Sequence, residues 1–161
     1  MGTIAIVVIV ITIVVALFIL GGAVWFAWDS DKRVKTFARS TDLVPGKPGR
    51  APEDWTSATS TEALLHQRIR YAIADVHANP AIPHDADLVA ARDRLDDAVF
   101  DLDDKLIAAA ELSDDDDKRA RLSSAESAVV VLEELPKKLW EAPKDTQLTD
   151  LEKVTAALAR A

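Results

Sequence analysis

The sequence predicts an all-α protein, with one N-terminal transmembrane helix followed by an antiparallel bundle of three main helices and a short C-terminal helix. Three observations support this prediction. The first 28 of the 161 residues carry no charged side chain. From residue 59 onward, apolar residues recur at steps of three and four, which is the spacing of one helix face. No stretch alternates apolar and polar residues over a useful length, as a half-buried strand would.

The N-terminal apolar segment, Ile4 to Trp28, is 25 residues long. A bilayer core of about 30 Å needs about 20 helical residues, so this segment is long enough to span a membrane with some tilt. Trp25 and Trp28 lie at its end, where aromatic side chains meet lipid headgroups. No Lys or Arg precedes the segment, and it is too long for the apolar part of a signal peptide, so we expect a retained anchor.

The residues after this segment are basic and predict its orientation. The span is followed by Lys32, Arg33, Lys35 and Arg39. Positive flanks stay in the cytoplasm, so we expect the N-terminus outside the cell and the C-terminal domain in the cytoplasm, at a plasma membrane. A plain stop-transfer flank explains these charges better than recognition of a specific lipid. Residues 1–40 thus form the predicted anchor with its basic extension.

Residues 41–56 are predicted to be a tether. Within eight residues the chain has three prolines and two glycines, namely Pro45, Gly46, Pro48, Gly49 and Pro52. Proline removes a hydrogen-bond donor and glycine weakens any helix, so this composition is typical of a loop. The tether would join the anchor to an acidic helical bundle over residues 57–161.

The first two helices of the bundle are predicted from their end signals. The first begins at Thr59, with Glu62 in the capping-box position, and ends before Asn79-Pro80. The second runs from Asp85 to about Leu112, and its apolar residues have the heptad spacing of a coiled coil.

Two further helices follow. Ser113 is the expected N-cap of the third, with the run Asp114–Asp117 in its first turn, where the helix dipole favours anions. The third helix is expected to end at Pro136. A short fourth helix is expected to follow Thr149.

Each predicted helix has one apolar stripe. The stripe residues are Leu65, Ile69, Ala72 and Val76 in the first helix, Leu88, Leu95, Val99, Leu102, Leu106 and Ala109 in the second, Leu122, Ala125, Val129 and Leu132 in the third, and Leu151, Val154 and Leu158 in the last. Short connections make consecutive helices antiparallel neighbours. Periodicity alone leaves open whether the stripes meet within one chain or between chains.

Charge and composition exclude several classes of function. Residues 29–50 have a net charge of +3 and residues 51–161 a net charge of −11, which gives −8 for the chain. An acidic domain lacks the basic surface of nucleic-acid binding, so we expect no nucleic acid partner. The absence of Cys excludes disulfides, thiolate zinc sites and a Cys nucleophile. Because no catalytic motif occurs, we expect no enzyme activity, cofactor, metal or small-molecule substrate.

An acidic stripe on the second predicted helix is a candidate binding site. Its members are Asp93, Asp97, Asp101 and Asp104, at steps of four, four and three. Such a stripe is able to bind a basic partner or cations, which leaves open the alternative of a cation-binding regulator or an enzyme. A solvated helix face, partly neutralised by neighbouring basic residues, is the simpler interpretation.

The three histidines form no catalytic pattern. His66 and His77 lie on one flank of the first predicted helix and are about 16 Å apart along its axis, too far to share a metal ion. His84 lies in the following loop. We expect all three to be ordinary surface residues or residues of a helix interface.

Two tryptophans outside the anchor are candidate partner-binding residues. Trp55 precedes the first predicted helix, and Trp140 lies between Pro136 and Pro143. A Trp at the edge of a bundle either holds a loop against the bundle or stays exposed as an anchor for a partner. The intramolecular role is favoured.

Two stretches carry a resemblance to known sequences. Arg50-Ala-Pro-Glu-Asp-Trp55 and then Glu62-Ala-Leu-Leu-His-Gln-Arg68 resemble uncharacterised single-pass membrane proteins of high-GC Gram-positive bacteria, in which a Trp precedes a Leu-His-x-Arg helix. Leu102–Ala110 resembles a later stretch of these proteins. The resemblance covers about residues 50–112 and implies a bacterial inner-membrane setting, with no activity to transfer.

These features favour a non-catalytic accessory or scaffold protein. The anchor would lie in the lipid bilayer and hold a cytoplasmic helical bundle near it for a protein partner, as in an accessory subunit of a larger membrane complex. The heptad spacing of the second helix also leaves open a homo-oligomeric membrane organiser.

Overall fold

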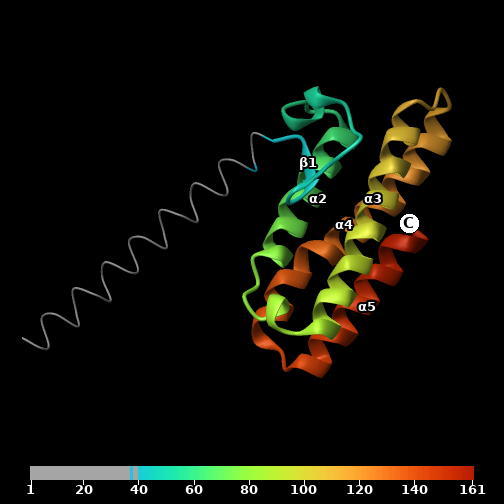
Figure 1. Ribbon diagram of the computed structural model, residues 1–161. Coiled ribbons are helices and arrows are strands. Elements are labelled where there is room, and N and C mark those ends of the chain that lie inside the picture. The colour runs from blue at the N-terminus through green and yellow to red at the C-terminus, as the bar shows by residue number, and fades with distance from the viewer. Residues whose placement is uncertain (1–36, 38–39) are drawn as a thin grey trace, which may run out of the picture. The chain divides into compact units, whose positions relative to one another are not determined.

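The computed structural model describes residue 37 and residues 40–161 of the chain. Within this part, Thr41–Ala161 forms one compact unit, whose four helices confirm the predicted helical bundle (Figure 1). The predicted membrane segment lies outside the described residues, and so do the candidate interface residues Trp25, Trp28, Lys32, Arg33, Lys35 and Arg39. Among the helices that the structure describes, none combines the length and the apolar composition needed to cross a bilayer.

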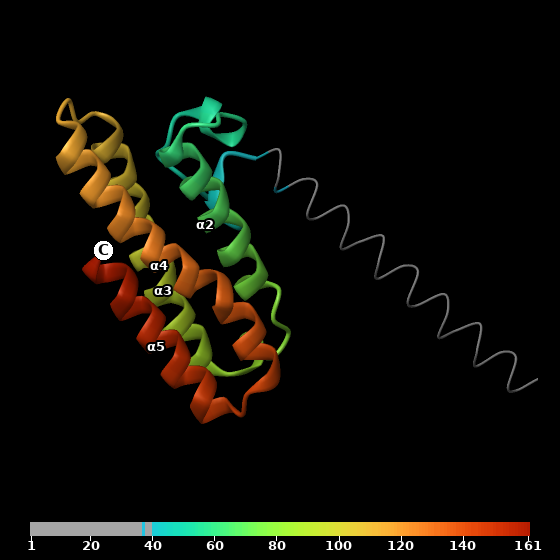
Figure 2. The ribbon, with the colours of Figure 1, turned by 180° about the vertical axis from the view of Figure 1, so that it is seen from behind.

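The bundle consists of α2 (Thr61–His77), α3 (Ala86–Ala110), α4 (Asp115–Glu141) and α5 (Lys144–Arg160). Consecutive helices run antiparallel, so α2 and α4 point one way and α3 and α5 the other (Figure 1). The closest packing nevertheless joins parallel helices, because α2 packs mainly on α4 and α3 mainly on α5. From behind, α4 lies between α2 and α5 (Figure 2).

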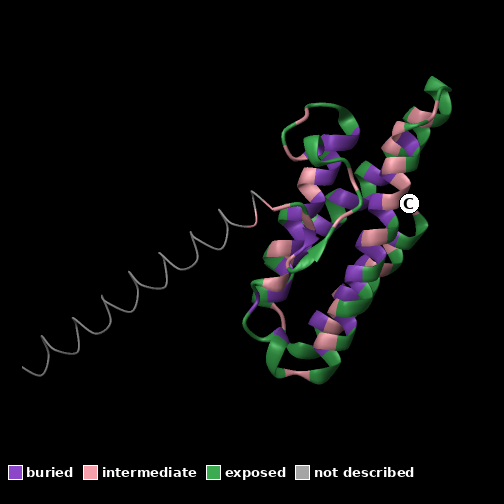
Figure 3. Cartoon of the chain, turned by 45° about the horizontal axis from the view of Figure 1, so that its top comes forward, coloured by how far each residue is buried: buried purple, intermediate pink, exposed green. Residues whose placement is uncertain are grey.

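The core follows the apolar stripes that the sequence predicts. Every stripe residue is buried except Leu122, which is partly buried against the core. Buried and exposed residues alternate along the helices, as expected for amphipathic helices (Figure 3). The apolar stripes therefore meet within one chain.

The stretch predicted as a tether is instead folded onto the bundle. Strands β1 (Asp42–Val44) and β2 (Lys47–Pro48) pair as an antiparallel β-hairpin. Gly46 occupies its turn with a φ of +79°, a conformation that suits glycine. Leu43 and Val44 have no exposed surface. The prolines and glycines therefore mark a tight turn between short strands, and two aliphatic residues hold the hairpin in the core.

Two helix starts differ from the prediction by one residue. Ser60, rather than Thr59, caps α2, and its Oγ accepts a hydrogen bond from the Ala63 amide at 3.3 Å. Asp114, rather than Ser113, caps α4, because its carboxylate accepts hydrogen bonds from the amides of Asp116 and Asp117. A carboxylate adds a favourable charge at a helix N-terminus, which explains the second shift.

The last two helices are longer than predicted. α4 continues through Pro136 to Glu141, because Leu135 and Leu139 on either side of the proline are buried in the core. Their burial offsets the lost backbone hydrogen bond. α5 begins at Lys144 rather than after Thr149. A short 3-10 helix (Ile82–His84) connects α2 to α3, and another (Glu53–Thr56) precedes α2.

Candidate functional site

Helix α2 carries a row of buried polar side chains. Glu62, His66 and Arg70 follow one another at steps of four and are at most 5% exposed. Residues four apart lie on one side of a helix, so this row faces the interior. Each member bonds to a different neighbour, which is what buried polar groups require.

Glu62 joins α2 to α4. Its carboxylate forms an ion pair with Lys118 near the start of α4. Burial alone would raise the pKa of Glu62, but the hydrogen bond from Lys118 and those of the capping turn bring it below its usual value. Glu62 is therefore held as an anion inside the bundle.

His66 joins α2 to α3. Its Nδ1 lies 2.6 Å from Oδ1 of Asp103, and both side chains are almost fully buried. The ring of Trp55 meets the imidazole edge-on, with 5.8 Å between ring centroids. The second oxygen of Asp103 is buried and has no hydrogen-bond partner. Burying a carboxylate oxygen without a hydrogen bond costs free energy, so the contact with His66 matters more here than it would on the surface.

Arg70 joins α2 to the β-hairpin. Its Nε donates a hydrogen bond to the backbone carbonyl oxygen of Asp42 at 2.7 Å. Burial lowers the pKa of Arg70, and the nearby carboxylates of Asp42 and Asp103 oppose that effect. The guanidinium thus lies between the hairpin and the His66–Asp103 pair.

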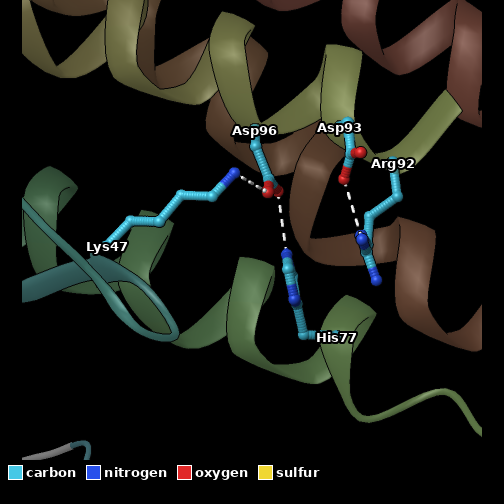
Figure 4. A network of polar contacts seen from close by, with 5 residues as sticks. All are labelled: Lys47, His77, Arg92, Asp93 and Asp96. Atoms are coloured by element: carbon cyan, nitrogen blue, oxygen red, sulfur yellow. Dashed lines mark hydrogen bonds and ion pairs between the residues drawn. The ribbon is translucent and has the colours of Figure 1, made fainter. Parts of the chain in front are cut away.

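A second buried polar contact involves His77, which lies at the end of α2 (Figure 4). Its Nε2 is 2.8 Å from Oδ1 of Asp96 on α3, and Lys47 of the β-hairpin donates to the other oxygen at 2.9 Å. Burial would raise the pKa of Asp96, but the hydrogen bonds from His77 and Lys47 outweigh it, so the pKa lies below its usual value. One carboxylate with no exposed surface therefore holds together α2, α3 and the hairpin.

The predicted acidic stripe does not form a joint site. Asp93 pairs with its neighbour Arg92 at 2.7 Å (Figure 4), and Asp104 pairs with Arg50, whereas Asp97 and Asp101 are exposed. In the described part of the chain, no group of three or more His, Cys, Asp or Glu side chains is placed to hold a metal ion. The stripe is thus a helix surface on which two of the four carboxylates pair with arginines.

The two candidate tryptophans have opposite surroundings. Trp55 is only 7% exposed and belongs to the core cluster, so it holds the segment before α2 against the bundle. The structure therefore removes Trp55 from the exposed candidates. Trp140, near the end of α4, is 61% exposed.

Arg68 and Glu133 join the outer sides of α2 and α4, and helical spacing places exposed apolar residues on the same side of each helix. Arg68 of α2 forms a two-pronged hydrogen bond to Glu133 of α4, at 2.8 and 2.7 Å. This hydrogen bond raises the pKa of Arg68 and lowers that of Glu133. Residues at steps of three, four and seven share this side of each helix. The exposed Leu64 and Tyr71 therefore lie on the same side of α2 as Arg68. The exposed Val130 and Trp140 lie on the same side of α4 as Glu133.

The sequence did not single out Asp96 and Asp103, and it predicted their histidine partners only as surface or helix-interface residues. The signal was a spacing: two histidines on one flank of α2 and two aspartates seven residues apart on α3. Asp96 and Asp103 stand among many acidic residues of α3, so burial alone distinguishes them. No family model, curated protein or solved structure matches the chain.

Proposed function

We propose that this protein is a non-catalytic, single-pass membrane accessory protein that presents a cytoplasmic helical bundle to a protein partner. The contact surface in this proposal is the face of α2 and α4 that carries Leu64, Tyr71, Val130 and Trp140, called here the α2–α4 face. The anchor and the cytoplasmic orientation rest on the apolar segment and its basic flank in the sequence.

The observation that supports this proposal is that most of the large exposed apolar side chains share one side of α2 and α4 by helical spacing. Five large apolar side chains are clearly exposed in the described part, and four of them belong to the α2–α4 face. Single exposed apolar residues are ordinary, whereas a cluster rimmed by charged side chains is typical of an interaction surface. By contrast, the buried His–Asp pairs are closed to a substrate, so they support no catalytic role.

Site-specific crosslinking in the native membrane tests the proposal. The full chain would carry a photo-crosslinking residue at Tyr71 or, as the control, at the exposed Asp101 of α3. We expect a discrete crosslinked product from position 71, none from position 101, and loss of the product when Val130→Asp is added. Equal crosslinking from both positions would contradict the proposal. A product with the mass of two chains would replace it with the homo-oligomeric alternative.

A further inference from the structure

The α2–α4 face ends in a hollow at the N-terminal ends of its two helices. The hollow has a volume of about 330 Å³, and its lining includes Thr61 of α2 and Asp115, Lys118, Leu122 and Glu126 of α4. Thr61 is three residues before Leu64, and by helical spacing it lies on the same side of α2. Glu126 likewise is four residues before Val130 on α4. The hollow is therefore continuous with the face and is able to receive a side chain of a bound partner.

The face has the length of a helix of about four turns. From Thr61 to Asp75, α2 advances by about 21 Å, at about 1.5 Å per residue. Helix α4 runs parallel to α2 and packs on it (Figure 1). Two packed helices present ridges and grooves of side chains, into which the ridges of a third helix fit. The surface therefore suits an amphipathic helix of about 14 residues, held by apolar side chains at helical spacing.

Acidic side chains without a full partner lie at both ends of the face. Arg68 and Glu133 neutralise each other, and Glu126 reaches the same guanidinium only at 3.8 Å. Asp75 is four residues after Tyr71 and has no ion-pair partner among the described residues. Neighbouring atoms shield it from water, which raises the pKa of Asp75, and no cation in the described part opposes this effect. Both carboxylates are therefore available to a cation that a partner brings.

The basic side chains near the face do not balance its acids. Lys118 is already paired with the buried Glu62. Arg119 is paired with Asp116. The exposed Lys137 of α4 offsets one of the two acids at most. A net negative charge thus remains, in keeping with the net charge of −11 over residues 51–161, and charge complementarity favours a basic partner.

We infer that the partner contacts the α2–α4 face with a basic amphipathic helix of about four turns. The apolar side of this helix covers Leu64, Tyr71 and Val130. Its lysines or arginines pair with Glu126 at the hollow and with Asp75 at the other end. This inference rests on the proposed function, because it names the chemistry of the partner that the same face binds.

Charge disfavours two other occupants of the face. A second copy of the chain would bring another acidic bundle, and like charges repel. The cytoplasmic leaflet of a membrane is anionic, so it would repel the same carboxylates. A basic helix of a different protein is attracted by them.

Mapping of the crosslink at position 71 tests the inference. The full chain with the photo-crosslinking residue at Tyr71 is irradiated in the native membrane, and mass spectrometry identifies the partner segment in the product. We expect a segment whose apolar residues recur at steps of three and four and whose lysines and arginines outnumber its acids. A segment without this spacing, or one with a net negative charge, would overturn the inference.

A charge reversal on the face tests the same pairs from the side of this chain. Asp75→Lys combined with Glu126→Lys should lower the yield of the crosslinked product about tenfold, because each change replaces an attraction by a repulsion. The control combines Asp97→Lys with Asp101→Lys on the exposed side of α3, which changes the net charge equally, and its yield should stay within about twofold of the wild type. Equal yields from the two variants would overturn the inference.

The outcomes separate this inference from the proposed function. Both variants change exposed positions, and their thermal midpoints by helical circular dichroism check that they fold. If the face variant does not fold, the identified partner segment still decides the question. No product from position 71, or a product of two copies of this chain, contradicts the proposed function and the inference with it. A product with the wrong segment or no response to charge reversal overturns the inference alone.

Discussion

Asp96 has no exposed surface, and yet His77 and Lys47 keep it ionised. Its lowered pKa has a consequence for stability. A carboxylate whose pKa is lower in the folded than in the unfolded chain stabilises the fold above its unfolded value, about 3.9. That contribution is lost as the pH falls through the lowered pKa of Asp96. Glu62 and Glu133 have lowered pKa values as well and act in the same direction.

The first prediction concerns this carboxylate. Asp96→Asn removes the charge that pairs with Lys47 and His77, so we expect the free energy of unfolding at pH 7 to fall by about 3 kcal/mol. The difference from the wild type should shrink on acidification to pH 3, because Asp96 in the unfolded wild-type chain, with a pKa of about 3.9, is then mostly protonated. Urea unfolding at both pH values measures it. The matched control is the exposed neighbour Asp97→Asn, with an expected change within about 0.5 kcal/mol. A difference that does not depend on pH would contradict the role of the charge.

Residue identity alone could not single out Asp96 and Asp103. Helix α3 has seven aspartates, and the sequence favoured the four that follow a regular stripe. The structure buries two others, because they lie at the edge of the apolar seam where α2 covers them. The apolar stripes were predictable because helical spacing dictates them, whereas a polar residue at a seam edge is placed by the neighbouring helix.

At the scale of an element, the β-hairpin shows that the same prolines and glycines are compatible with two different structures. Proline and glycine are typical of loose tethers and also of tight turns. What decides between the two is Leu43-Val44, an aliphatic pair just before the turn that the bundle buries completely. A pair of residues is too short for a periodic signal, so the sequence predicted only that no helix forms there.

The second prediction separates a tether from an element of the core. Leu43→Ala should lower the free energy of unfolding by about 2–5 kcal/mol, as expected for a fully buried leucine. In a tether the same change would be nearly neutral. Thermal unfolding of the full chain, followed at a helical circular dichroism wavelength, measures the effect. Thr41→Ala, at an exposed position one residue before β1, is the control and should leave the midpoint almost unchanged.

At the scale of the whole molecule, the main unpredicted feature is the pairing of parallel helices. The loops make consecutive helices antiparallel, which the sequence predicted from their lengths. Long-range ion pairs then join α2 to α4 through Arg68 and Glu133, and α3 to α5 through Arg94 and Glu152. Loop length carries no information on which non-consecutive helices pack most closely, so side-chain packing decides it.

The third prediction tests the membrane orientation on which the proposed function depends. Single cysteines at Ser30 and at the exposed Ser127 would be labelled in intact cells with a membrane-impermeant maleimide. We expect both to react only after lysis, because the basic flank keeps them in the cytoplasm. Labelling of Ser127→Cys before lysis would reverse the orientation. Replacement of Lys32, Arg33, Lys35 and Arg39 by Gln should mix the two orientations.

The parallel pairing also divides the folded unit into two helical hairpins, α2–α3 and α4–α5, laid side by side. Each leaves an apolar face that only the other covers, so the two should behave as complementary halves. A chain cut between Ser113 and Asp114, in the short loop that joins the halves, keeps every such contact. We expect fragments 41–113 and 114–161 of the compact unit to be poorly helical when separate and to recover helical circular dichroism when mixed in equimolar amounts. The α3–α4 loop is therefore a permissive site for splitting the protein into a reconstitutable pair.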